Sequence, residues 1–192
     1  MPRPRTIELT DPRALRALAH PIRLALLGAL RREGPLTATQ AGALVGESAA
    51  SCSFHLRQLA KYGLVEEAGG GRGRERPWRA TARFTSWSGV ASTPEMAAAL
   101  ELFTSVVAER LFEQVMDWIS RRSTEAPEWQ AAELFGDTIL YVTSDELARL
   151  DQDVQALVEP YLGRIENAEA RPPRARPVTF MTFGFARRED AS

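Results

Sequence analysis

Proline and glycine divide the first third of this chain into short helical segments, and this pattern most limits its possible folds. Asp11-Pro12 is a typical helix start, with Asp as the N-cap and Pro at the first helical position. His20-Pro21 interrupts a stripe of leucines at helical spacing, because the residue before a proline avoids the α region. Gly34 ends the stripe. We therefore expect two short helices, over residues 11–19 and 21–33.

Two further helices follow, each with its own start and stop signals. Residues Thr37-Ala38-Thr39-Gln40 fit a capping box, and Gly46 supplies the turn after the short helix that it starts. Ser48 is the next N-cap candidate. The helix after it runs to about Tyr62, and Gly63 ends it as a C′ glycine commonly does.

A short hairpin with a basic tip is predicted next. Its strands are Val65 to Ala68 and Pro77 to Thr81, and a loop rich in glycine and arginine joins them over residues 69–76. Helices with a tight turn, followed by such a hairpin, describe a winged helix-turn-helix. Residues 1–92 are therefore predicted to form a winged helix-turn-helix DNA-binding domain.

Charge is distributed unevenly along the chain, although the net charge is only −1. Residues 1–92 carry 14 basic and 7 acidic side chains, whereas residues 93–192 carry 10 and 18. A basic half joined to an acidic half indicates a domain that binds a polyanion, followed by a second domain with another task.

The helix from Ser48 to Tyr62 presents a polar face without an acidic residue. Cys52, Leu56 and Leu59 define its core side. Small residues at its start let the backbone approach DNA, Arg57 and Gln58 suit base edges or phosphates, and Lys61 suits a phosphate. The predicted DNA-contacting residues of this helix are Ser48, Ala50, Ser51, Ser53, Phe54, Arg57, Gln58 and Lys61.

Two features of this surface allow more than one interpretation. Phe54 either touches thymine methyl groups in the major groove or packs against the neighbouring helix. Arg72, Arg74 and Arg76 form a basic loop that is either a solvated charge run or a wing on the minor groove or the phosphates. The position of the loop after a helix-turn-helix favours DNA.

Residues 15–80 resemble the DNA-binding domain of ArsR-type (arsenical-resistance-repressor-like) winged-helix regulators. Three segments carry the resemblance: residues 17–27 (ALAHPIRLALL), residues 53–59 (SFHLRQL) and residues 62–65 (YGLV). The resemblance implies a homodimer whose recognition helices enter successive major grooves, with wings on the flanks. It also implies a repressor that a signal releases from DNA.

Metal sensing is not carried over from this resemblance. Residues 38–45 lack the paired cysteines of metal-sensing members, and they contain no His, Asp or Glu. Cys52 stands alone on the core side of its helix, as a small buried hydrophobe rather than a redox switch. We expect His20 to pack or cap at a helix junction, and His55 to be structural or to contact a phosphate. No metal and no cofactor are expected.

The second half is predicted to be a helical α+β dimerisation and effector domain over residues 93–192. A long helix over residues 94–122 has apolar residues on more than one stripe, which suits a partner subunit. Ile139 to Val142 and Val178 to Phe185 are predicted strands, and a capping box at Thr143 starts the helix between them. Five aromatic residues line an effector pocket or form ordinary core: Trp118, Trp129, Tyr141, Tyr161 and Phe180.

Taken together, these patterns predict a mainly α protein with small β elements that regulates transcription. We expect a dimeric, sequence-specific repressor that binds double-stranded DNA in the cytoplasm, without a membrane segment. A winged-helix module that binds protein instead of DNA is the alternative. Catalysis is not expected, because the sequence contains neither a Gly-rich phosphate cradle nor a nucleophile elbow.

Overall fold

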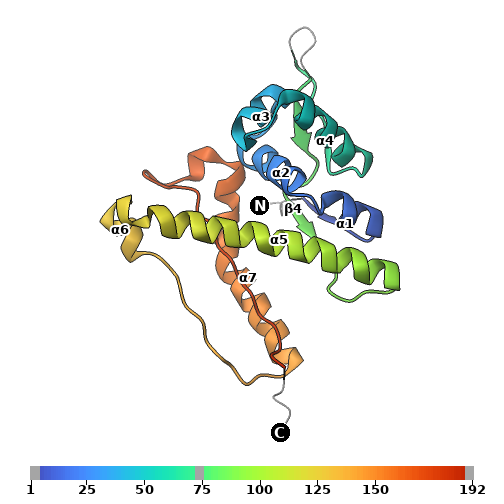
Figure 1. Cartoon of the computed structure of the whole chain (residues 1–192). Coiled ribbons are helices and arrows are strands. Elements are labelled where there is room, and N and C mark those ends of the chain that lie inside the picture. The colour runs from blue at the N-terminus through green and yellow to red at the C-terminus, as the bar shows by residue number, and fades with distance from the viewer. Residues whose placement is uncertain (1–4, 72–75, 189–192) are drawn as a thin grey trace. The chain divides into compact units, whose positions relative to one another are not determined.

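The computed structural model describes residues 5–71 and 76–188 (Figure 1). The described residues form two compact units, one up to Ser120 and one from Arg121 onward. The predicted domain boundary lies earlier, after residue 92. The first unit extends further because residues of the long helix join its core, as described below.

The four predicted N-terminal helices are present, and their local start signals act as expected. They are α1 (Pro12–Leu18), α2 (Pro21–Glu33), α3 (Ala38–Val45) and α4 (Ala49–Lys61). Asp11 and Ser48 accept hydrogen bonds from the backbone at the starts of α1 and α4, and the capping box of Thr37 and Gln40 is formed. Gly63, after α4, has a positive φ of 69°.

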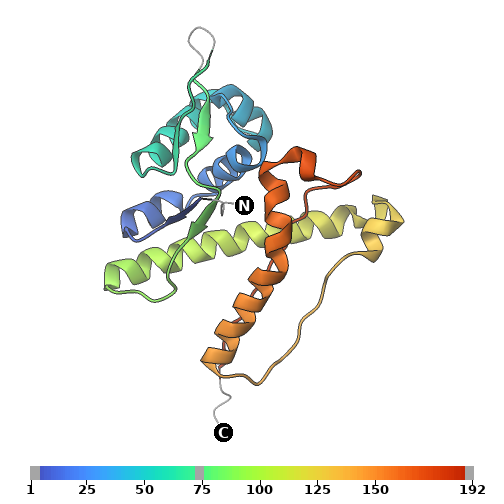
Figure 2. The same ribbon diagram turned by 180° about the vertical axis from the view of Figure 1, so that it is seen from behind.

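Two small sheets complete the first unit. The predicted hairpin consists of β2 (Val65–Glu67) and β3 (Trp78–Ala80), which pair antiparallel. A second sheet, not predicted, joins β1 (Thr6–Glu8) to β4 (Phe84–Ser86) in parallel. Figure 2 shows β4 leading from the hairpin toward the loop before the long helix. The fold class, mainly α with small β elements and an N-terminal helix-turn-helix domain, is confirmed.

One apolar core holds the first unit together. Leu15, Leu26, Leu56 and Leu59 are fully buried and bring α1, α2 and α4 together. The long helix α5 (Pro94–Arg121) adds Phe103, which is also buried, to the same core. Burial of a large apolar side chain strongly favours folding. Because Phe103 is buried in this core, the first turns of α5 fold as part of the helix-turn-helix unit.

The second unit contains η1 (Arg122–Thr124), α6 (Pro127–Ala131), α7 (Ser144–Glu166) and η2 (Ala168–Ala170). The capping box of Thr143 and Glu146 is formed at the start of α7. The predicted strands over residues 139–142 and 178–185 are wrong, because neither segment has strand structure. Their apolar residues suit a strand, but a strand also requires a paired neighbour, which a local pattern does not reveal.

No helix in the described part of the chain is long and apolar enough to cross a membrane.

Candidate nucleic-acid interface

The tight connection between α3 and α4 sets the position of the predicted recognition helix. Gly42 lies on α3 so close to the following turn that a Cβ atom there would meet the Glu47 carbonyl oxygen at 2.5 Å. The Glu47 N–H donates to the Gly42 carbonyl at 3.0 Å. Ser48 then caps α4 by accepting from the Ser51 N–H at 3.1 Å. The two helices therefore form the compact pair seen in Figure 1.

The solvent-facing side of α4 carries the residues that the sequence predicted for DNA contact. Ala50, Phe54, Arg57 and Lys61 are exposed. Three more predicted residues are half-buried beside them: Ser51, Ser53 and Gln58. The opposite side is fully buried through Cys52, Leu56 and Leu59. The helix therefore presents one acid-free face with two cationic side chains.

Two contacts organise the centre of this face. Arg57 donates to the Ser53 hydroxyl at 2.9 Å, one turn earlier on the helix. This bond orients the guanidinium along the face and toward the helix start. The Phe54 ring meets the His55 ring edge-on at 5.2 Å and remains 51% exposed. Phe54 thus offers an apolar surface beside the Arg57 side chain.

Acidic residues on the strands offset part of the positive charge of the wing. Arg76 pairs with Glu67 at 3.3 Å, and Arg79 pairs with Glu66 at 2.8 Å. All four side chains are exposed, and such ion pairs are weak because water screens them. A competing anion would displace these partners at little cost for the same reason. Arg72 and Arg74 lie outside the described residues.

A histidine pair lies behind the face, where α2 begins next to α4. His20 is the N-cap of α2, and its Nδ1 accepts from the Ile22 N–H at 3.2 Å, which confirms the expected capping role. The His20 and His55 rings are 4.6 Å apart. Burial first, and then the nearby Arg23 guanidinium, lower the pKa of both imidazoles. His55 therefore packs against His20 in a setting that disfavours its protonated form.

Cys52 is completely buried among apolar side chains, as the sequence predicted. Burial raises the pKa of its thiol, with the Glu47 carboxylate adding to the shift. A protonated, inaccessible thiol reacts slowly with oxidants. No group of three His, Cys, Asp or Glu side chains within the described residues is arranged to hold a metal ion.

The aromatic residues proposed to form an effector pocket are mostly at the surface. Tyr141 is 99% exposed, and Tyr161 and Phe180 are also exposed. Trp129 is half-buried, with the Arg176 guanidinium 5.0 Å from its ring. Trp118, on α5, is half-buried as well. An effector pocket lined by these five side chains stays a prediction.

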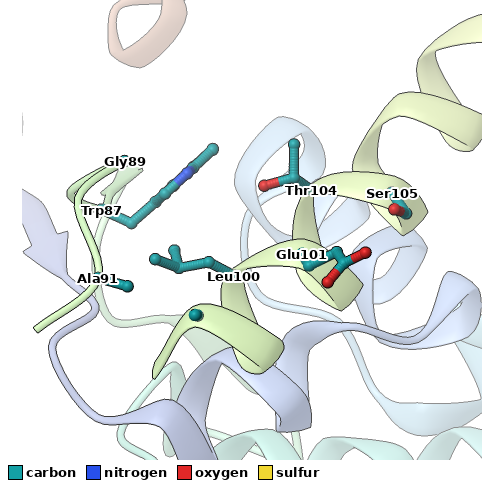
Figure 3. Close-up of a pocket in the computed structure, with 8 residues that line it drawn as sticks. Trp87, Gly89, Ala91, Leu100, Glu101, Thr104 and Ser105 are labelled. Atoms are coloured by element: carbon teal, nitrogen blue, oxygen red, sulfur yellow. The ribbon is translucent and has the colours of Figure 1, made fainter. Parts of the chain in front are cut away.

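A hollow that the sequence did not predict lies beside the first turns of α5 (Figure 3). Trp87 forms one wall, and Leu100, Glu101 and Thr104 line it from α5. The sequence signal for Trp87 was weak: a tryptophan between Ser86 and Ser88, where a large ring with a polar indole N–H suits a partly exposed position.

Comparison with known proteins identifies the class of the N-terminal domain. Residues 18–68, from the end of α1 through the hairpin strand β2, match a protein family described as "Helix-turn-helix domain". A helix-turn-helix places one helix in the DNA major groove. The match therefore points to a DNA-binding regulator rather than an enzyme.

No curated protein matches this chain. Among solved structures, the chain is similar to one titled "Crystal structure of RV1404 from Mycobacterium tuberculosis", with 15% identity. The similarity covers 84% of this chain and 86% of that chain, with a TM-score of 0.31.

Proposed function

We propose that this protein is a dimeric winged helix-turn-helix repressor that binds a partly palindromic DNA operator. The observation that carries the proposal is the acid-free, exposed face of α4, where Arg57 is oriented by Ser53 and flanked by Phe54. In this proposal α4 enters the major groove, and the arginine wing lies on the phosphates or in the minor groove.

The residues of α4 have distinct roles in the proposed complex. Arg57 and Gln58 contact base edges or phosphates near the centre of the helix, and Phe54 contacts thymine methyl groups. Lys61, at the end of the helix, neutralises a phosphate. Ala50 and Ser51 permit close approach of the helix start, where free N–H groups favour an anion.

Dimerisation through α5 is the second part of the proposal. The second half of this helix exposes the apolar side chains of Met116 and Ile119. A helix whose apolar residues extend beyond its core-facing side is suited to a second copy of itself. Two copies would present two α4 helices to half-sites one helical turn apart. The resemblance to ArsR-type regulators supports the same arrangement, and such a regulator acts in the cytoplasm.

The test is binding of the purified protein to the DNA upstream of its own gene, against a scrambled duplex of equal length, across a salt series. We expect a large preference for the native duplex that survives near-physiological salt. Arg57→Ala should weaken specific binding by about 1–3 kcal/mol. Arg16→Ala is the matched control, because the Arg16 guanidinium lies on Glu95 of α5, at 2.9 Å, rather than on the α4 face.

Three outcomes would contradict the proposal. Equal binding of both duplexes that vanishes with salt would leave a non-specific, electrostatic DNA binder. Equal losses for Arg57→Ala and Arg16→Ala would remove the α4 face from the interface. No binding even at low salt would favour the alternative, a winged-helix module that contacts protein.

A further inference from the structure

The hollow beside α5 is large enough to hold a small molecule and is separate from the α4 face. Its volume is about 430 Å³, within the range of ligand pockets. None of its lining residues belongs to α3, α4 or the hairpin. It is formed by the loop after β4 on one side and the first turns of α5 on the other, both within the first unit.

A fixed aromatic ring forms one wall of the hollow. Trp87 packs edge-on against Phe103, with ring centroids 4.9 Å apart and an interplanar angle of 88°. Phe103 is buried in the core, so the indole rests on a rigid support. Trp87 is nevertheless 37% exposed, and Figure 3 shows it across the hollow from Thr104. Gly89 lies near the rim and has open space around it.

The helix that forms the other side of the hollow also carries an acidic group whose charge is not neutralised, and Figure 3 shows its carboxylate directed away from the indole. Glu101 is exposed and, within the described part of the chain, forms no ion pair, whereas Glu95, earlier on the same helix, pairs with Arg16. No arginine or lysine lines the hollow. Thr104 and Ser105 add hydroxyl groups on the same side, above the apolar surface of Leu100.

This combination of groups selects for one kind of ligand. The face of an indole attracts a cation through its quadrupole, and the unpaired carboxylate on the adjoining helix adds a longer-range charge attraction. The apolar floor favours a ligand that also has a hydrophobic body, which a hydrated metal ion lacks. We propose that the hollow binds a small organic cation, an ammonium group carried on an apolar body. The role of this cation as an effector rests on the proposed DNA-binding function, whereas the binding of the cation in the hollow does not.

The test uses nuclear magnetic resonance of the full-length, nitrogen-15-labelled protein, with Trp87→Phe to assign the Trp87 indole signal. The probes are benzyltrimethylammonium, which is permanently charged, and benzyl alcohol, which is neutral and of similar shape. We expect a saturable shift of the Trp87 signal, with the charged probe bound roughly tenfold more tightly. Glu101→Gln should reduce that difference by removing the charge attraction, while the contribution of the indole face remains. Glu109→Gln, which removes one charge further along α5 outside this hollow, should preserve the difference.

Equal binding of the two probes, no saturable shift at millimolar concentrations, or equal effects of Glu101→Gln and Glu109→Gln would each overturn the site. The effector role is tested by adding benzyltrimethylammonium at saturation to the protein on its upstream DNA. A change in DNA affinity that Glu101→Gln reduces supports the role, and an unchanged affinity overturns it. DNA binding is first measured without the probe. A failure of the proposed DNA-binding function is therefore distinguished from a failure of the effector role.

Discussion

The imidazole rings of His20 and His55 lie 4.6 Å apart, at the junction between the start of α2 and the middle of α4. The Nδ1 atom of His20 must be unprotonated to accept the Ile22 N–H and cap α2. Arg23 adds a positive charge nearby, while Glu47 is the acidic group that acts in the opposite direction. The junction therefore disfavours protons on both rings.

Acidification should consequently destabilise the helix-turn-helix unit. The pKa of each histidine is below its ordinary value of 6.5 in the folded chain, so the unfolded chain binds protons first. This contribution to stability is complete above pH 6.5 and is lost as the pH falls below it. Urea unfolding at pH 7.5 and pH 5.5 measures the loss. The double variant His20→Asn, His55→Gln retains an N-cap acceptor and should lose less stability on acidification; an unchanged loss would refute the mechanism.

Two glycine substitutions should change stability in opposite directions. Gly42→Ala places a Cβ atom against the Glu47 carbonyl oxygen and should cost about 1–3 kcal/mol, because backbone cannot move aside easily. Gly28→Ala, inside α2, meets Arg110 at an ordinary 3.6 Å and should stabilise by up to about 1 kcal/mol. Thermal unfolding of both variants checks the pair. A stable Gly42→Ala protein would contradict the tight turn.

Removing an acidic partner from the hairpin should strengthen DNA binding. Glu66→Gln releases Arg79 from its 2.8 Å ion pair, so more positive charge is available to phosphates. We expect affinity to rise a few-fold at low salt and the gain to shrink as salt screens the charges. Fluorescence anisotropy with a labelled duplex measures the DNA affinity at each salt concentration. Glu33→Gln, which frees Arg32 at the end of α2, is the control and should have a smaller effect.

Introducing a charged residue among the exposed apolar side chains in the second half of α5 should dissociate the proposed dimer. Met116→Asp replaces a 62% exposed apolar side chain with one that resists burial at an interface. We expect the molar mass from light scattering to fall to that of one chain, with a strong loss of operator affinity. Val90→Asp makes a comparable change in a loop and should leave the mass unaltered. A wild-type chain that is already monomeric would refute dimerisation.

The N-terminal helices were predictable because their limits are set by neighbours in sequence. Asp11, His20, Thr37 and Ser48 each bond to a backbone N–H two or three residues later. The parallel pairing of β1 with β4 was not predictable, since it joins residues far apart and each strand is only three residues long. Strand pairing between distant residues is not visible in a local pattern. This is also why the predicted strands over residues 139–142 and 178–185 are wrong.

The candidate site likewise has features that the sequence predicts and features that it does not. The solvent-facing side of α4 follows from helical periodicity once Cys52, Leu56 and Leu59 are recognised as core. Partial neutralisation of Arg76 and Arg79 depends on the register of the hairpin, which brings Glu67 and Glu66 beside them. The hollow at Trp87 depends on how one loop packs against Phe103. Neither relationship is encoded locally.

The pairing of β1 with β4 also determines how this domain would respond to a cut backbone. A single break between Gly71 and Arg76 would give two fragments, each holding one strand of both small sheets. Leu36 and Trp78 add a further bridge across the break, and the buried side chains of the core come from both fragments. The two pieces should therefore recognise each other and reassemble, which makes the wing a suitable place to split this protein for fragment complementation.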